Sequence, residues 1–313
     1  MFNRQTQPGW MAVALQPQQV ALAHVVRGAD GARPRLTVLD SVKRERGSDA
    51  DALTRLRRSM ALHRYRCTTL LDHSAYQFVQ VNAPSVPAEE MKSALRWAIK
   101  DSLDFPVDDA IIDVLQVPAD GAPPGRPPLA FAVAARRERV AERVQAFQRA
   151  GLRLGVIDIV EAAQRNVAAL FEQPGRGLAF LAFHDYGGLL SFTRDGELFA
   201  SRHIDITADA LTEDGDTSRR DALFERIGLE VQRSLDNFDR QFSQIALQRV
   251  LVAAPPGAAA LVSYLADNLY LPVQAADLTT VMDTEAFPAL NDLTAQAQWL
   301  QPIGIALRGE DAR

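Results

Sequence analysis

Residues 11–26 read MAVALQPQQVALAHVV: an apolar run, a polar turn and a second apolar run. This pattern predicts two strands joined by a tight connection, because both runs have the length of a strand and the turn contains proline and glutamine. Hairpins of this shape hold a phosphate in several ATPases, through successive backbone N–H groups. Between Met11 and Val26 the sequence has no Asp, Gly, Ser, Thr or Lys. We therefore expect the shape of a phosphate-binding hairpin without its chemistry.

The size and composition of the chain are those of a globular protein with two lobes or domains. It has 313 residues, of which 47% are hydrophobic and 23% charged, and this balance argues against disorder. The net charge is −5, from 34 Lys and Arg against 39 Asp and Glu. Because nucleic-acid binding rests on basic phosphate contacts, this balance argues against a dedicated nucleic-acid binder. The single cysteine, Cys67, excludes an internal disulfide framework and fits a reducing compartment.

The sequence shows no segment that would carry the chain across a membrane. The N-terminus, MFNRQTQPGW, lacks the apolar core of about 7–15 residues that a signal peptide has. No stretch reaches the roughly 18 apolar residues of a transmembrane helix. We therefore expect a cytoplasmic protein that meets the membrane only through a partner.

Hydrophobic patterns divide the chain into two similar halves. After the opening hairpin, the first half continues with a strand at 34–42 and a helix at 49–63. The second half repeats this order: two strands around a glycine-bearing turn, an Asp195–Gly196 hairpin turn, a third strand and a long helix over about 219–242. A helix and a strand-like tail at 295–309 are expected to close the chain.

A compact β-α-β-β-α unit over about residues 76–152 interrupts the first half. Its first helix is well marked, because Pro87 suits the first helical position and Glu89 and Glu90 complement the positive end of the helix dipole. One apolar stripe runs along this helix through Met91, Ala94, Leu95, Ala98, Ile99 and Leu103. The pattern predicts a duplication on the scale of a fold, with one inserted subdomain.

Five stretches, in this order along the chain, together resemble one superfamily. They are ALRWAIKDSLDFPVDDAIIDVLQV (94–117), QRAGLRLGVIDIVEAAQRNVAAL (148–170), DGELFASRHIDI (195–206), GLEVQRSLDNF (228–238) and PIGIALRG (302–309). The set resembles the actin-like ATPases and, within them, the cytoplasmic type IV pilus assembly proteins of the PilM family, with its MSHA-pilus relative MshI. The resemblance runs from about Trp10 to Arg308.

The resemblance implies an α/β, actin-like fold. Two duplicated, ribonuclease H-like lobes are expected, with a small α+β subdomain inserted into the first lobe in place of the second subdomain of actin. The implied boundaries are residues 1–75, 153–175 and 296–313 for the first lobe, 76–152 for the inserted subdomain and 176–295 for the second lobe. Because a fold alone does not give a function, the functional interpretation depends on the residues at the nucleotide positions.

In actin-like ATPases the first hairpin carries Asp-x-Gly, with backbone N–H groups that hold phosphate and an Asp that serves Mg²⁺ through water. Here the place is taken by residues 14–17, Ala-Leu-Gln-Pro, and Pro17 also removes a donor. The adenosine-side strand runs into LVAAPPGAAAL instead of Gly-Gly. The second hairpin keeps Asp185, Gly187 and Gly188 as a residual nucleotide site. The resemblance therefore implies no catalytic residues, no metal and no cofactor, with binding of ATP and Mg²⁺ at the residual site as the alternative.

In the PilM family a short N-terminal peptide of a bitopic inner-membrane protein, the PilN-like subunit, lies in a groove between the first lobe and the inserted subdomain. Such a groove needs apolar pockets and a few polar groups that fix the register of the peptide. Trp97, Lys100 and Phe105 of the inserted unit are the residues that we expect to form it. The implied function is a non-catalytic scaffold, peripheral to the inner membrane, that couples the assembly motor ATPase to the alignment complex of the pilus.

Two alternatives stay open at this point. An active actin-like ATPase of the same machinery would use Asp185 with an unusual first hairpin. The cytoplasmic L-type component of type II secretion shares the fold but normally continues into a transmembrane helix, which the sequence up to Arg313 does not contain.

Two further patterns bear on possible sites. The histidines predict no metal site, because they show no HxxxH or CxxC spacing: His24, His63, His73, His184 and His203. A local basic cluster is formed by Arg55, Arg57, Arg58, Arg64 and Arg66. Its simpler interpretation is a solvated helix face, and the alternative is contact with anionic lipid headgroups or an acidic partner.

Overall fold

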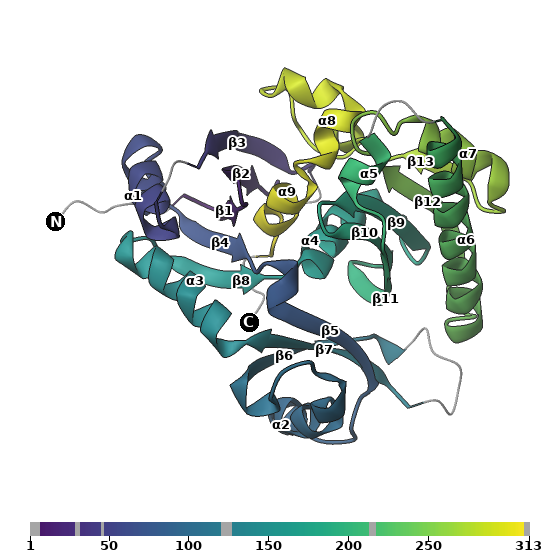
Figure 1. Ribbon diagram of the computed structural model, residues 1–313, viewed down its shortest axis with the longest axis horizontal. Coiled ribbons are helices and arrows are strands. Elements are labelled where there is room, and N and C mark those ends of the chain that lie inside the picture. The colour runs from purple at the N-terminus through teal and green to yellow at the C-terminus, as the bar shows by residue number, and fades with distance from the viewer. Residues whose placement is uncertain (1–6, 29–31, 45–46, 120–126, 213–216, 310–313) are drawn as a thin grey trace.

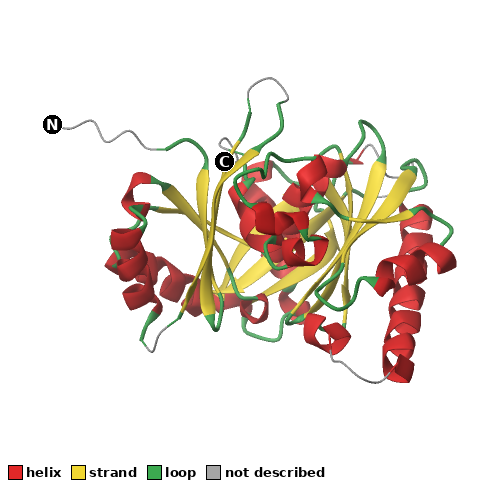
Figure 2. Ribbon diagram, turned by 90° about the horizontal axis from the view of Figure 1, so that it is seen from above, coloured by secondary structure: helices red, strands yellow, loops and turns green. Residues whose placement is uncertain are grey.

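The computed structural model describes residues 7–28, 32–44, 47–119, 127–212 and 217–309. They form two lobes, each built on a five-stranded sheet, and a smaller three-stranded unit (Figure 1). Seen from above, helices lie between the two large sheets and on the outer side of each (Figure 2). The α/β class and the duplication expected from the sequence are thus confirmed.

The first lobe is built on β1 (Trp10–Leu15), β2 (Gln19–Val26), β3 (Arg35–Lys43), β4 (Arg66–Leu70) and β8 (Leu154–Asp158). Their order in the sheet is β3-β2-β1-β4-β8. The opening hairpin is confirmed, since β1 and β2 pair antiparallel along their whole length, and β3 extends the antiparallel meander. The strands β4 and β8 are parallel to β1, and β8 forms the edge of the sheet.

Helices cover both faces of this sheet: α1 (Asp49–Ser59) and α3 (Arg137–Arg149) on one face, α4 (Val160–Ala168) and α9 (Leu300–Ala306) on the other. Because successive side chains of a strand point to opposite faces, β1 serves both layers. Met11, Val13 and Leu15 pack with α1 and α3, whereas Ala12 packs with α4 and α9.

The C-terminal segment differs from its sequence-based prediction. The prediction of a strand-like tail is wrong, because residues Leu300–Ala306 form the helix α9. Pro302 lies in the first turn of this helix, where its missing N–H costs no hydrogen bond. Ile303 and Ile305, on different sides of the helix, are both fully buried. A short helix that is buried all round has no polar side, and its apolar run therefore looks like a buried strand.

The second lobe repeats the first. Its strands are β9 (Gly177–His184), β10 (Gly187–Arg194), β11 (Glu197–Ile204), β12 (Leu247–Ala253) and β13 (Val273–Ala275), in the order β11-β10-β9-β12-β13. The predicted turn at Asp195–Gly196 joins β10 to β11, with φ of +51° and +79° as a tight hairpin turn requires. Its helices are α5 (Ala208–Thr212), the long α6 (Thr217–Gln241), α7 (Ala260–Asn268) and α8 (Leu293–Ala297).

The inserted unit has the predicted β-α-β-β order before α3. Its sheet runs β5 (Tyr76–Asn82), β7 (Leu129–Arg136), β6 (Ala110–Gln116), all antiparallel, with α2 (Ala88–Ala98) on one face. The apolar stripe of α2 packs on that face through Met91 and Leu95. On the other face Phe131 stacks on Phe78, with ring centroids 4.6 Å apart, and joins the core of the second lobe. The unit is therefore wedged against both lobes, and α3 leads back from it to α1.

Candidate functional site

The carboxyl ends of parallel strands meet at one edge of each large sheet, where open α/β folds bind ligands. In the first lobe this edge carries the β1–β2 turn, and the turn is closed on itself. The N–H of Gln16 donates to the carbonyl of Gln19 at 2.9 Å, and Nε2 of Gln19 donates to Oε1 of Gln16 at 2.8 Å. Pro17 has no N–H to offer. Of the backbone donors in this turn, that of Gln16 is already used and Pro17 has none.

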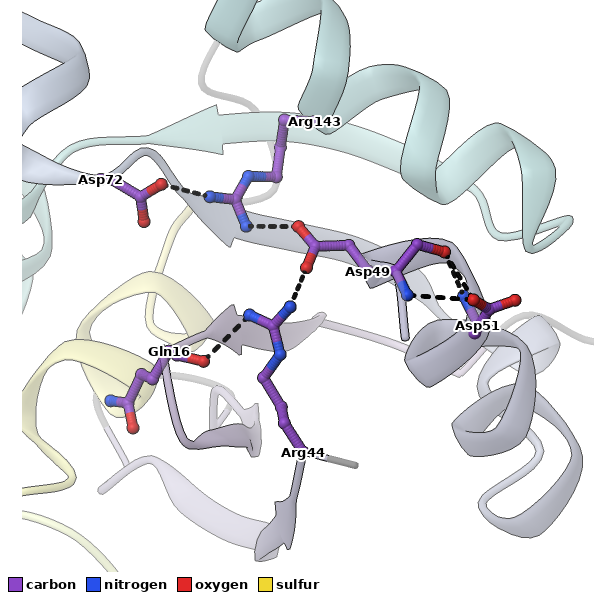
Figure 3. Close-up of polar contacts among 7 residues, drawn as sticks. Gln16, Arg44, Asp49, Asp51, Asp72 and Arg143 are labelled. Atoms are coloured by element: carbon purple, nitrogen blue, oxygen red, sulfur yellow. Dashed lines mark hydrogen bonds and ion pairs between the residues drawn. The ribbon is translucent and has the colours of Figure 1, made fainter. Parts of the chain in front are cut away.

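Two arginines fix the surroundings of this turn (Figure 3). Arg44 donates to the carbonyl oxygen of Gln16 at 3.1 Å and forms an ion pair with Asp49 at the start of α1. Arg143, a residue of α3 that is only 6% exposed, reaches Asp72 at 3.0 Å and Asp49 at 4.0 Å. The network pairs opposite charges and ties the loop after β4 to α1 and α3, so we assign it a structural role.

The two glycines of the second hairpin, Gly187 and Gly188, pack closely against neighbouring side chains. Gly187 has φ of +136°, and a Cβ there would lie 2.4 Å from Cε1 of His203. A Cβ on Gly188 would lie 2.9 Å from the ring of Phe183. Asp185, the third residue predicted for the residual nucleotide site, is exposed in the turn. The structure therefore places all three predicted residues in one turn, with the two glycines pressed against side chains.

A stack of aromatic rings connects the second hairpin with the loop that follows β4 in the first lobe. Tyr186, at the tip of the second hairpin, stacks on His73 of the first lobe with centroids 4.4 Å apart and ring planes 13° apart. His184 stacks on the same tyrosine at 5.1 Å, and His203 lies 5.4 Å from His73. The hydroxyl of Tyr186 accepts a hydrogen bond from Gln301 of α9 at 2.9 Å. Tyr186 thus joins the second lobe to the first, through His73 and Gln301.

Burial favours the neutral form of two histidines of this stack, His184 and His73. It lowers the pKa of His184 to about 4, helped by the charge that His73 would carry. Burial also lowers the pKa of His73, with a second contribution from His203 and an opposing one from Asp185. A neutral imidazole stacks on a tyrosine ring without the cost of burying a charge.

Two buried carboxylates lie beside the stack, and both have partners. Glu161, near the start of α4, accepts a hydrogen bond from the hydroxyl of Tyr76 at 2.7 Å, and burial raises its pKa to about 7. Asp158, the last residue of β8, pairs with Arg308 at 2.8 Å. The second pair ties the C-terminal segment to the edge of the first-lobe sheet.

Replacement of Glu161 by glutamine is expected to change how stability depends on pH. Because the pKa of Glu161 is raised in the folded state, its protonated form stabilises the fold fully below about pH 4.5, and this contribution is lost as the pH rises through 7. Between pH 5 and 8 the wild type should lose up to about 3 kcal/mol of unfolding free energy by this route, and Glu161→Gln should not. Urea unfolding at both pH values measures the difference. Equal slopes with pH in the two proteins would contradict the assignment.

The segment at the adenosine-side position, LVAAPPGAAAL, has a turn at its prolines. After β12 the chain turns at Pro255, whose carbonyl oxygen accepts from the N–H of Ala258 at 3.0 Å. Gly257 has φ of +81°, and only after it does α7 begin, at Ala260. The strand therefore ends in a closed turn, whereas the actin-like pattern runs directly into Gly-Gly.

The three residues predicted for a peptide groove do not share one surface. Trp97 is 73% exposed on the outer side of α2, and Lys100 is exposed in the turn after this helix. Phe105 is buried in the core under α2, with the guanidinium of Arg136 4.3 Å from its ring centroid. Phe105 supports the subdomain from within, and its side chain is not available to a peptide.

A groove with a volume of about 430 Å³ lies elsewhere, between α3 and the edge strand β8. From α3 it is lined by Val144 and Gln148, which are one turn apart. From the next segment it is lined by Leu152, Arg153, Leu154, Gly155, Val156 and Ile157. This groove lies between the first lobe and the helix that leads out of the inserted unit, and no local sequence pattern marks it.

Metal chemistry has no support in the part of the chain that the structure describes. There, no group of three or more His, Cys, Asp and Glu residues could hold an ion. Cys67 is buried, and burial raises the pKa of its thiol to about 12, which makes it unreactive. Within the same residues, no helix is long and apolar enough to cross a membrane.

Comparison with known proteins rests on structure, since no family model and no curated protein sequence matches the chain. A chain of the solved PilM-PilN type IV pilus biogenesis complex is similar over 96% of this chain and 98% of its own, with a TM-score of 0.71 and 21% identity. A Bacteroides thetaiotaomicron protein with actin-like ATPase fold and unknown function covers 93% of this chain and 99% of its own, with a TM-score of 0.50 and 6% identity. The fold is therefore actin-like.

A third similarity concerns type II secretion. The cytoplasmic domain of EpsL, an inner-membrane component of the type II secretion system of Vibrio cholerae, covers 88% of this chain and 87% of its own. The TM-score is 0.46 and the identity 14%.

Proposed function

We propose that this protein is a cytoplasmic, non-catalytic scaffold of type IV pilus biogenesis of the MSHA type. It would bind the cytoplasmic N-terminal peptide of a PilN-like inner-membrane protein and so sit at the membrane through its partner. The observation that carries the proposal is the similarity to a chain of a PilM-PilN complex over almost the whole length of both. A link to the assembly motor ATPase belongs to the same proposal.

The nucleotide positions support a role without catalysis. The first hairpin uses the N–H of Gln16 within its own turn, and Tyr186 of the second lobe stacks on His73 of the first. Nucleotide hydrolysis in this fold needs donors for phosphate and a carboxylate for Mg²⁺. The buried carboxylates beside the stack are already bonded to Tyr76 and Arg308.

The groove between α3 and β8 suits an extended peptide. An edge strand offers unpaired backbone groups, to which a peptide can add as a further strand. β8 carries no Lys or Pro that would block such pairing, and Gly155 in the middle of the strand is exposed, with the ring of Trp10 packed against it. Val144 and Val156 supply half-buried apolar surface on either side, and Gln148 supplies a polar group that can fix the register. We therefore place the peptide in this groove, with the surface around Trp97 and Lys100 as the second candidate.

Filling the groove should weaken peptide binding. Gln148 is exposed on α3, so Gln148→Trp should fold normally while its ring occupies the groove. We expect the affinity to fall at least tenfold, by about 1.4 kcal/mol or more. The measurement is a calorimetric titration with a synthetic peptide that spans the residues before the membrane helix of the PilN-like protein from the same organism.

Two variants control this experiment. Gln145→Trp places the same ring on an exposed position of α3 outside the groove and should leave the affinity unchanged. Trp97→Ala tests the second surface. If Trp97→Ala weakens binding and Gln148→Trp does not, the peptide binds on α2 and the groove assignment is wrong. If the wild type shows no binding, the proposed partner is wrong.

One observation keeps an ATPase as the second candidate function. Asp185 is exposed at the tip of the second hairpin, where a metal-bound nucleotide could reach it. Turnover of ATP that depends on Mg²⁺ and is lost in Asp185→Ala would establish this alternative.

A further inference from the structure

The fold gathers a set of arginines that are scattered in sequence. Since β1, β4 and β8 are parallel, their amino ends lie together at the edge opposite to the β1–β2 turn. The helices α1 and α3 run back to this edge and end there. Arg57 and Arg58 lie in the last turn of α1, and Arg149 lies in the last turn of α3.

Three contacts confirm that these ends are neighbours. The N–H of Cys67, the second residue of β4, donates to the carbonyl oxygen of Arg153 at 2.8 Å. A Cβ on Gly151 would lie 3.2 Å from a guanidinium nitrogen of Arg57. Arg66 lies over the ring of Trp10, with its guanidinium carbon 4.1 Å from the centroid. The amino end of the first-lobe sheet thus forms one continuous surface, the basic edge: Arg57, Arg58, Arg64, Arg66, Arg149 and Arg153.

The basic edge is exposed and has one sign of charge. All six of these arginines are exposed. The segments that build it, residues 55–71 and 143–157, contain no Asp or Glu, although the whole chain has a net charge of −5. Among the described residues, no carboxylate lies within ion-pair distance of Arg57, Arg58, Arg64, Arg66 or Arg149. Two exposed arginines of α6 differ in this respect, since Arg226 and Arg233 are paired with Asp205 and Glu230.

We propose that the basic edge binds the surface of an anionic phospholipid bilayer. A cluster of cations at one end of an acidic protein is complementary to the negative cytoplasmic leaflet, and each arginine near such a surface adds to the attraction. The choice of a membrane over another polyanion rests on the proposed function. Arg153 and Leu154 line the peptide groove at the basic edge, so a peptide that leaves the groove there would lead towards the bilayer.

The test uses the purified full-length protein with no peptide present. The probe is a set of vesicles of phosphatidylethanolamine with about 30% phosphatidylglycerol, compared with pure phosphatidylcholine, in flotation at low salt. We expect binding to the anionic vesicles only, and its loss at high ionic strength. The variant R57Q/R58Q/R64Q leaves Arg66 on Trp10 and leaves the groove untouched. It should weaken binding about a hundredfold, since each arginine accounts for about fivefold.

The matched control removes the same charge elsewhere. R226Q/R233Q/R240Q changes three exposed arginines of α6 and should bind the vesicles as the wild type does. An equal loss in both triple variants, or equal flotation with phosphatidylcholine, would overturn the proposal. Tighter binding of the same edge to a DNA oligonucleotide than to the vesicles would also overturn it. Peptide affinity, measured separately, should be unchanged in R57Q/R58Q/R64Q, so failure of this proposal and failure of the proposed function are distinct results.

Discussion

Replacement of Gly304 by alanine is expected to lower the free energy of unfolding by about 3 kcal/mol. Gly304 lies in α9 directly against α4, and a Cβ there would lie 2.2 Å from the carbonyl oxygen of Ala163 and 3.0 Å from its Cα. These are backbone atoms of a buried helix and cannot move aside as the end of a side chain could. The carbonyl oxygen of Gly304 also accepts a hydrogen bond from Asn166 at 2.9 Å, which would be strained by the same shift.

Gly228 offers the matched control. It lies inside α6, and a Cβ there would meet only Tyr264 at 3.4 Å and Leu265 at 3.8 Å, which are ordinary contacts. Since glycine is a poor helix former, Gly228→Ala should be neutral or stabilise the protein by up to about 1 kcal/mol. Urea unfolding of the two variants measures both effects. A Gly304→Ala protein as stable as the wild type would show that α4 and α9 are not packed in this way.

Removal of the ring that joins the lobes should have the second largest effect. Tyr186→Ala takes away a half-buried ring that stacks on His73 and His184, and its hydroxyl, which accepts a hydrogen bond from Gln301. We expect a loss of about 2–3 kcal/mol in the free energy of unfolding, which urea unfolding measures. Burial also raises the pKa of Tyr186 well above its usual range, so the ring is neutral at any pH used.

A second variant separates the ring from its hydroxyl. Tyr186→Phe keeps the stack and loses only the bond to Gln301, so it should cost about 1 kcal/mol. If both variants lost the same stability, the hydrogen bond and not the stack would join the lobes. Tyr186→Ala should still fail to bind Mg·ATP, because the first hairpin remains closed by Gln16 and Gln19.

Local sequence patterns were sufficient for much of the fold. The hairpin of 11–26 is visible because both strands have strand length and one polar turn, and α6 is visible because its apolar stripe repeats at helical spacing over 25 residues. The prediction for the segment of α9 failed because this segment is apolar on all sides. Its helical form is fixed by contact with α4, and Ala163 is far away in sequence.

The site was less accessible to sequence reasoning. Asp185, Gly187 and Gly188 could be found from the hairpin pattern, but their neighbours could not, because His73 and Tyr186 meet only through the packing of two lobes. A bulky Tyr186 between Asp185 and Gly187 was the one local sign that the turn is filled. Phe105 was chosen for its aromatic character, and only the structure shows that it points into the core. Which strand lies at the edge, as β8 does, is a property of the sheet and not of the strand.

The central claim of the proposed function is that this protein with an actin-like fold does not bind nucleotide and acts as a scaffold. Its most direct test is a calorimetric titration of the purified protein with Mg·ATP up to millimolar concentration. We predict no heat beyond that of dilution, which corresponds to binding weaker than about −4 kcal/mol. Saturable binding at micromolar ATP, lost in Asp185→Ala, would contradict the claim and would make the second hairpin a working nucleotide site.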